Sequence, residues 1–71
     1  MSKRNFLLVT REYSDTQSGG RVLIPIDKII HIEETDEHKA RIVYYIDGEI
    51  VRIVTQELFE NVVIGVYIIK L

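Results

Sequence analysis

The chain has 71 residues, of which 46% are hydrophobic, and a formal net charge of −2. A chain of this length buries only about 60% of the surface that its unfolded form exposes, so disulfides, metals or oligomerisation usually stabilise it further. It contains no cysteine, which excludes disulfides and thiolate metal sites. We therefore expect one small domain, residues 1–71, that is stabilised by self-association into a homo-oligomer.

No targeting or membrane-spanning segment is expected. The polar stretch Met1–Asn5 is followed by only four apolar residues, Phe6–Val9, which are too few for a signal peptide. The most apolar stretch, Val62–Ile69, is far shorter than the ~20 residues that span a bilayer. Together with the absence of cysteine, these features predict a cytoplasmic protein.

The first half of the chain is typical of strands separated by turns. Phe6–Thr10 predicts a first strand with Arg11–Tyr13 as its continuation, and Ser14–Gly20 is a cluster of turn-forming residues. Arg21–Ile24 predicts a second strand that ends at Pro25, because proline has no N–H for a sheet ladder. The next predicted segments are a tight turn at Asp27-Lys28, a third strand that begins with Ile29–Ile32, and a polar loop over Glu33–Lys39.

The strongest signal is a hairpin, in which Ala40–Ile46 and Glu49–Thr55 flank the pair Asp47-Gly48. Asp-Gly favours a two-residue type I′ turn, with a positive φ at both central positions. The turn fixes the register, so that Ile46 faces Glu49. One face of the hairpin is then almost wholly apolar, and we predict that it contributes core residues Ile42, Tyr44, Val51 and Ile53.

The opposite face of this hairpin is too apolar for a fully solvated surface. It carries four apolar residues and two arginines, namely Val43, Tyr45, Ile50, Val54, Arg41 and Arg52. Aromatic residues and arginine are enriched at protein interfaces. We therefore predict that Val43, Tyr45 and Ile50 form a protein–protein interface.

Nucleic-acid binding is the alternative function. Aromatic side chains beside arginines on a sheet can stack on bases and contact phosphates. The candidate residues for RNA or DNA are Arg11, Arg41, Tyr45 and Arg52. The acidic balance of the chain argues against a broad basic field, and so favours the protein interface.

The C-terminal segment predicts a short helix followed by a sixth strand. Thr55 can cap a helix from Gln56 to about Asn61, and Val62–Leu71 has the composition of a strand around Gly65. An open strand with so little charge invites uncontrolled pairing. We therefore assign Val66 and Ile68 to an interface as well. The strand can close beside the first strand of its own subunit or cross to a neighbour, and the small size of the chain favours the crossing.

The remaining polar clusters do not predict catalysis or cofactor binding. The segment His31–His38 gathers two imidazoles and four carboxylates. We interpret it as a solvated acidic loop, because strong zinc sites use tighter ligand spacing and usually cysteine. The turn Ser18–Gly20 is followed by a strand, whereas a phosphate-binding loop leads into a helix. We predict a non-enzymatic protein without a cofactor or a metal.

These elements predict an all-β fold, a small antiparallel meander or barrel-like sheet of five to six strands with one short helix before the last strand. The order of segments resembles that of the small FlbD/SwrD-like family of bacterial proteins. The residues that carry this resemblance are Val9-Thr10, Gly20, Val22, Ile24, Ile29, Ile32-Glu33, Gly48, Val51 and Val54. The resemblance implies a bacterial protein, with a role in flagellar function or swarming.

A second resemblance is to the carbon-storage-regulator family of RNA-binding β-dimers. Leu7–Arg11 looks like the opening strand of that family, whose subunits interleave their strands. The Gly-Ile-x-Ala-Pro segment typical of the family has no counterpart in this sequence. This resemblance implies the nucleic-acid alternative.

Overall fold

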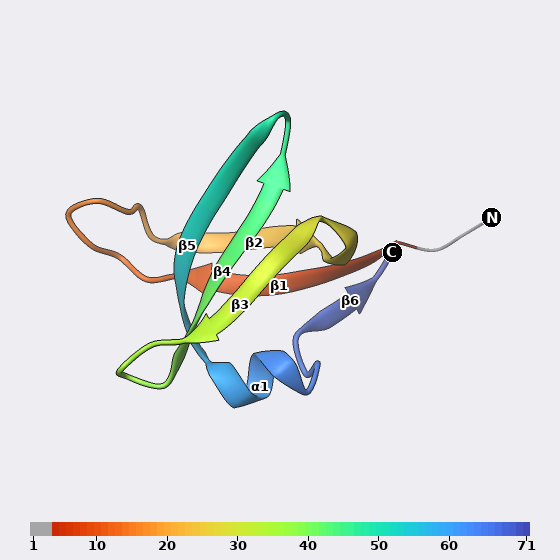
Figure 1. Cartoon of the computed structure of the whole chain (residues 1–71). Helices are drawn as coiled ribbons and strands as arrows, with labels where there is room; N and C mark the ends of the chain where they lie inside the picture. The colour runs from red at the N-terminus through yellow and green to blue at the C-terminus, as the bar shows by residue number, and fades with distance from the viewer. Residues whose placement is uncertain (1–3) are drawn as a thin grey trace.

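The structure is a computed structural model that describes residues 4–71 (Figure 1). Its elements in chain order are β1 (Asn5–Arg11), β2 (Gly20–Pro25), the 3-10 turn η1 (Ile26–Lys28), β3 (Ile29–Glu34), β4 (Lys39–Ile46), β5 (Glu49–Leu58), α1 (Phe59–Val63) and β6 (Ile68–Lys70). The six strands form one open antiparallel sheet in the order β2-β1-β5-β4-β3, and β6 pairs with β1. The predicted all-β fold with a short helix before the last strand is confirmed.

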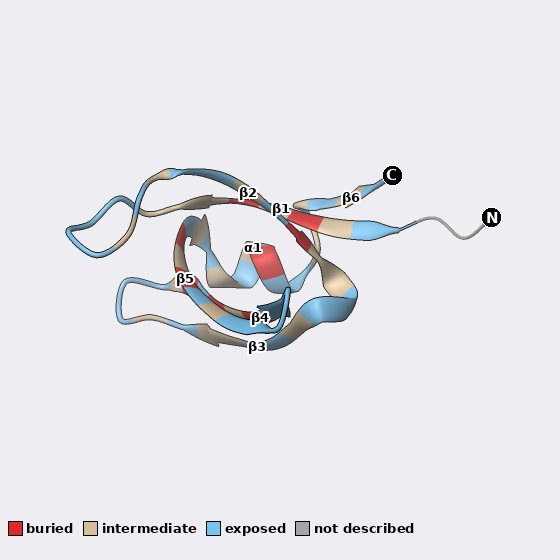
Figure 2. Cartoon of the chain, turned by 90° about the horizontal axis from the view of Figure 1, so that it is seen from above, coloured by how far each residue is buried: buried red, intermediate tan, exposed pale blue. Residues whose placement is uncertain are grey.

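The sheet bends into two layers that enclose the core. Viewed from above, β1, β2 and β6 lie in one layer and β3, β4 and β5 in the other (Figure 2). The long strand β5 connects the layers, because it pairs with β4 along its length and reaches β1 at Thr55, which is opposite Arg11. The helix α1 lies beneath one end of the strands (Figure 1).

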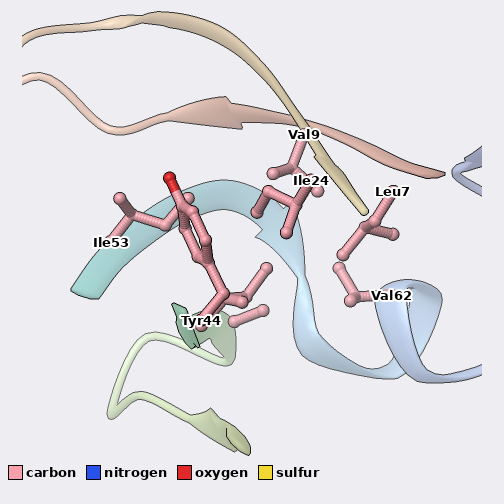
Figure 3. Packing of buried hydrophobic residues seen from close by; sticks show 8 residues of the cluster. Leu7, Val9, Ile24, Tyr44, Ile53 and Val62 are labelled. Atoms are coloured by element: carbon pink, nitrogen blue, oxygen red, sulfur yellow. The ribbon is translucent and has the colours of Figure 1, made fainter. Parts of the chain in front are cut away.

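Side chains from both layers and from the helix fill the space between them. The buried hydrophobic residues are Leu7, Val9, Ile24, Ala40, Ile42, Tyr44, Ile53 and Val62. Figure 3 shows Val62 of α1 pointing toward Leu7 of β1, so that the helix closes one end of the core. Thr55 is fully buried among them, and its hydroxyl lies within hydrogen-bonding distance of the Ala40 and Glu57 carbonyl oxygens.

The predicted hairpin is confirmed in both turn and register. Asp47 and Gly48 have φ values of 51° and 80°, as a type I′ turn requires. Ile46 is opposite Glu49, and Ile42 is opposite Ile53. Three of the four predicted core residues are buried; the fourth, Val51, is partly buried and packs against the core.

The start of the predicted helix is wrong. β5 continues to Leu58, and α1 begins three residues later than expected, with Leu58 as its N-cap and no side-chain cap. Thr55 does not cap the helix, because its hydroxyl faces the interior of the sheet. The end of β5 remains extended because it meets β1, where the Glu12 N–H donates to the Val54 carbonyl at 2.9 Å.

The extent of the sixth strand also needs correction, because only Ile68–Lys70 form it. Gly65 has a φ of 87°, and the N–H groups of Gly65 and Val66 donate to the carbonyls of Val62 and Asn61. This pair of bonds is a Schellman cap, which ends the helix and reverses the chain. The strand then pairs with β1 of its own chain, Ile69 opposite Phe6, rather than crossing to a neighbour.

The predicted polar loop over Glu33–Lys39 is shorter than expected. β3 extends to Glu34 and β4 begins at Lys39, so a tight turn joins them. Thr35 organises this turn, because its N–H donates to the Lys39 carbonyl and its hydroxyl accepts from the Lys39 N–H. His38 closes the turn with a φ of 66°, a conformation more usual for glycine.

Candidate interaction surface

The outward side of the β4–β5 hairpin carries an exposed apolar group. We call this surface, made of Val43, Tyr45 and Ile50 with Arg41 and Arg52 beside them, the outer hairpin face. Tyr45 is directly opposite Ile50, and Val43 is opposite Arg52. Tyr45 and Ile50 are 47% and 53% exposed. The alternation of β4 and β5 therefore places these five residues on one surface, as the Asp47-Gly48 turn dictates.

Two further exposed apolar residues lie on β3 and at the end of β4, and both were missed in the sequence. Ile30 is 57% exposed and sits in a bulge of β3, where the register with β4 shifts between Tyr44 and Val43. Ile46 is 37% exposed at the end of β4, beside the turn. Strict alternation would place Ile46 with the core. The turn end of the hairpin extends beyond the first layer, however (Figure 1).

One of the two arginines on the outer hairpin face is held by an ion pair. The Arg41 Nη1 donates to Glu33 Oε1 at 2.8 Å across the β3–β4 pair, and His31 Nε2 lies 3.3 Å from Glu33 Oε2. The hydrogen bond from Arg41, followed by that from His31, lowers the pKa of Glu33 from its ordinary 4.5. Within the described chain, Arg52 has no such carboxylate partner. The positive charge of this surface therefore comes mainly from Arg52.

The fourth candidate nucleic-acid residue lies elsewhere. Arg11 follows Leu7 and Val9 in the alternation of β1, so its side chain is directed toward the inside of the fold. Its Nη2 donates to the Gly19 carbonyl at 3.4 Å, and its Nε is buried with no partner within residues 4–71. The structure therefore groups Arg41, Tyr45 and Arg52 but does not bring Arg11 to them.

The C-terminal candidates form a separate surface. Val66 is 60% exposed in the turn after α1, and Ile68 is 43% exposed in β6. Exposed Ile64 and Leu71 lie on the same segment. Figure 1 shows β6 beside β1, away from the turn of the β4–β5 hairpin. Val66 and Ile68 therefore do not extend the outer hairpin face.

The outward side of the first layer is a third apolar surface, and our sequence interpretation did not assign it. Phe6 is opposite Pro25 on one side and Ile69 on the other, and Leu8 is opposite Leu23. Leu23 is 41% exposed. The signal was present, because Phe6–Val9 is apolar at every position instead of alternating, which indicates a strand with two apolar faces.

The two histidines have different carboxylate partners. Across residues 4–71, no three histidine, aspartate or glutamate side chains are placed to hold a metal ion. His31 contacts Glu33, while His38 Nδ1 lies 2.8 Å from Glu34 Oε2, so the two imidazoles have different partners. The same residues include no helix long and apolar enough to cross a membrane.

Comparison with models of protein families, with curated proteins and with solved structures gives no match. The resemblances to the FlbD/SwrD-like and carbon-storage-regulator families stay predictions. The surfaces of the fold therefore provide the basis for proposing a function.

Proposed function

We propose that this protein is a non-enzymatic binding domain that acts through protein–protein contact, and that copies of the chain associate through the outer hairpin face. The observation that carries the proposal is the exposed apolar group on a paired, well-defined sheet, with Tyr45 and Ile50 about half exposed. Apolar groups of this kind, bordered by polar residues, mark interaction sites on small soluble domains.

The chemistry of the outer hairpin face suits a protein partner. Tyrosine and arginine are the residue types that most often dominate binding energy when an interface desolvates them. Tyr45 presents a large ring with a polar end, and the aliphatic stem of Arg52 can cover the neighbouring apolar area while its charge stays in water. A second copy offers the same combination, so a two-fold interface matches like with like.

Val66 and Ile68 belong to the proposal as a second contact area. Their surface is separate from the outer hairpin face, so an association through the hairpin leaves it free. We assign it to contact with further subunits or another protein. We also propose a bacterial, cytoplasmic location, supported by the cysteine-free sequence, which suits a reducing compartment, and by the family resemblance.

Binding of RNA or DNA has less support. Arg41 already pairs with Glu33, and Arg11 lies on another part of the molecule. Phosphate contacts would make binding fall steeply with salt, whereas an apolar contact would not. A nucleic-acid pool bound with strong salt dependence, and released by Arg52→Ala, would favour this alternative over the protein interface.

The proposal is tested by measuring mass against concentration by sedimentation or light scattering. We expect the unmodified protein to exceed the mass of one subunit at tens of micromolar. Tyr45→Ala should weaken this association, and Tyr13→Ala is the matched control, because Tyr13 is 78% exposed in a loop outside the face. A single-subunit mass for the unmodified protein would overturn the proposal, as would equal weakening by both variants.

A further inference from the structure

One half of β5 has an unpaired backbone edge. β5 pairs with β4 over its whole length, but on its other side it meets the first strand only where Arg11 faces Thr55 and the Glu12 N–H donates to the Val54 carbonyl. The Gln17 side chain then occupies one more position, because its Oε1 accepts from the Val54 N–H at 3.1 Å and its Nε2 donates to the Val54 carbonyl at 2.9 Å. Beyond Val54, the segment Glu49–Ile53 has no partner on this side within the described residues.

The groups that point out of this edge follow from the alternation of the strand. In an antiparallel ladder, the N–H and C=O of every second residue point to the same side. Val54 points toward Gln17, so Arg52 and Ile50 point the same way. Their two N–H and two C=O groups form the open part of the edge, and both residues are exposed.

The other open edges of the sheet, on β2, β3 and the three-residue β6, carry the usual protection against pairing. β2 is six residues long and ends in Pro25, which has no N–H. β3 is bulged at Ile30 and ends in two carboxylates, Glu33 and Glu34. Short strands, proline, bulges and charges are the devices by which proteins block edge-to-edge pairing. The open half of β5 has no proline and no bulge, and Arg52 is the only charge among its outward-pointing groups.

We infer that the open half of β5 pairs with the same segment of a second copy, antiparallel and about a two-fold axis at Val51. This inference goes beyond the proposed function, because the copies then meet along the β5 edge beside the outer hairpin face and leave that face open. It makes the two β3-β4-β5 layers one continuous six-stranded sheet across the dimer.

Hydrogen bonding selects this register. When Val51 faces the partner's Val51, Ile50 faces the partner's Arg52 at both ends, and all the outward-pointing groups of both copies bond to one another. A shift of the pairing by two residues toward the turn places Ile50 opposite the partner's Ile50. It also places Arg52 opposite the partner's Gly48, whose φ of 80° is not that of a strand. A shift in the other direction places Ile50 opposite the partner's Val54, whose backbone N–H and C=O already bond to the Gln17 side chain.

Charge and apolar surface favour the same register. The shift toward Val54 also places Arg52 directly opposite the partner's Arg52, and like charges in that position are destabilising. Centred on Val51, each Arg52 instead lies beside an Ile50. The apolar part of the outer hairpin face then continues across the two-fold axis, from Tyr45 and Ile50 of one copy to those of the other.

Single-cysteine crosslinking tests this register, because the natural chain has no cysteine. Val51→Cys places two thiols opposite each other in a non-hydrogen-bonded pair, where Cα atoms are ~4.5 Å apart and a disulfide can form. Glu49→Cys is the matched control on the same face of β5, and its thiols would be about 13 Å apart, four residues along the strand. Under mild oxidation, we expect a disulfide-linked dimer from Val51→Cys and little from Glu49→Cys.

A second variant tests the hydrogen bonds without a thiol. Arg52→Pro removes an N–H that points out of the edge and not toward β4, and Arg52→Ala keeps that N–H while removing the same charge. We expect Arg52→Pro to raise the dissociation constant about tenfold or more relative to Arg52→Ala, since a two-fold pair loses two hydrogen bonds. If circular dichroism shows that Arg52→Pro does not fold, the comparison of Val51→Cys with Glu49→Cys alone tests the inference.

The outcomes separate this inference from the proposed function. Equal crosslinking of the two cysteine variants, in a protein that still dimerises, would overturn the β5 edge and leave the outer hairpin face as the contact. Selective crosslinking of Val51→Cys with loss of affinity in Arg52→Pro would support the edge. A monomeric unmodified protein would overturn both.

Discussion

The two halves of β5 differ in how their edges are satisfied, although they belong to one strand. Val54–Leu58 has partners on both sides, from β4 and from a mixture of β1 backbone and side chains. Glu49–Ile53 has a partner on one side only and attaches to the molecule through β4 and through its inward side chains. Side chains therefore take the place of a missing strand next to the core, and this replacement stops at Val54.

The closed half shows two such replacements. Gln17 bonds both backbone groups of Val54 through its amide and also donates to the Glu12 carbonyl, so it joins β1 to β5. Glu57 accepts from the Thr10 N–H at 2.7 Å, where β1 lies between its contacts with β6 and β5. Each side chain satisfies a polar group that would otherwise be left unpaired beside the core, and unpaired buried groups are costly.

The largest loss of stability should come from shortening Ile53, the buried side chain of the open half of β5. Ile53 is 5% exposed and packs in the core, while Ile50 points outward from the same half of β5. We expect Ile53→Ala to lower the free energy of unfolding by about 2–5 kcal/mol, as for buried aliphatic residues generally. Ile50→Ala should change it by less than about 0.5 kcal/mol in the monomer. Denaturant unfolding measures both, and similar losses would mean that the two faces of β5 are wrongly assigned.

The next largest loss of stability should come from removing the Gln17 side chain, which bonds to the closed half of β5 at Val54. Gln17→Ala leaves the Val54 N–H without a partner and should cost about 1–3 kcal/mol, while the Val54 carbonyl still accepts from the Glu12 N–H. Gln56→Ala is the matched control, since the Gln56 amide is exposed and makes one long bond, 3.4 Å, to the Arg11 carbonyl. Amide hydrogen exchange at Val54 should accelerate in Gln17→Ala alone. Unchanged protection there would contradict the role of Gln17 as a replacement for a strand.

A smaller loss of stability is expected from adding a side chain at Gly20 or Gly48, two glycines that lie at strand ends. From the sequence, a side chain at Gly48 in the hairpin turn should cost more than one at Gly20 in the longer loop. The structure changes this expectation, because Gly20 has a φ of 107°, further from the left-handed helical region than the 80° of Gly48. We now expect Gly20→Ala to cost at least as much as Gly48→Ala, each on the order of 1–2 kcal/mol. Thermal unfolding of the two variants measures the order.

The sequence predicts the parts of this fold that depend on alternation and on a short turn. Asp47-Gly48 together with apolar residues at every second position gives the register, the buried face and the three residues Val43, Tyr45 and Ile50 on the other face. The candidate surface can be derived in this way because all its residues lie within one hairpin. Nothing beyond the neighbouring strand is needed to place them.

The features that were missed depend on contacts between distant segments. β5 continues past Thr55 because Val54 and Glu57 bond to residues near position 12, more than 40 residues earlier in the chain. Thr55 is a good helix cap by composition, but a buried hydrogen bond to Ala40 uses its hydroxyl instead. The turn at His38 was missed for a local reason, because a positive φ is usually signalled by glycine or asparagine and not by histidine. The open edge of β5 becomes visible only when the partners of β1 are known.

The smallest effect concerns the ion pair at the rim of the outer hairpin face. Arg41 lowers the pKa of Glu33, so the pair stabilises the fold fully above pH 4.5, and this contribution is lost as the pH falls through the lower pKa of the folded state. We expect an NMR titration of the Glu33 carboxyl to have its midpoint below 4.5 in the unmodified protein. The midpoint should move upward in Arg41→Gln, because the hydrogen bond from Arg41 is the largest cause of the shift. His31→Gln is the comparison and should move it less. If Arg41→Gln leaves the midpoint of the Glu33 titration unchanged, Arg41 is not held by Glu33. Arg41 would then again be a candidate for phosphate contact.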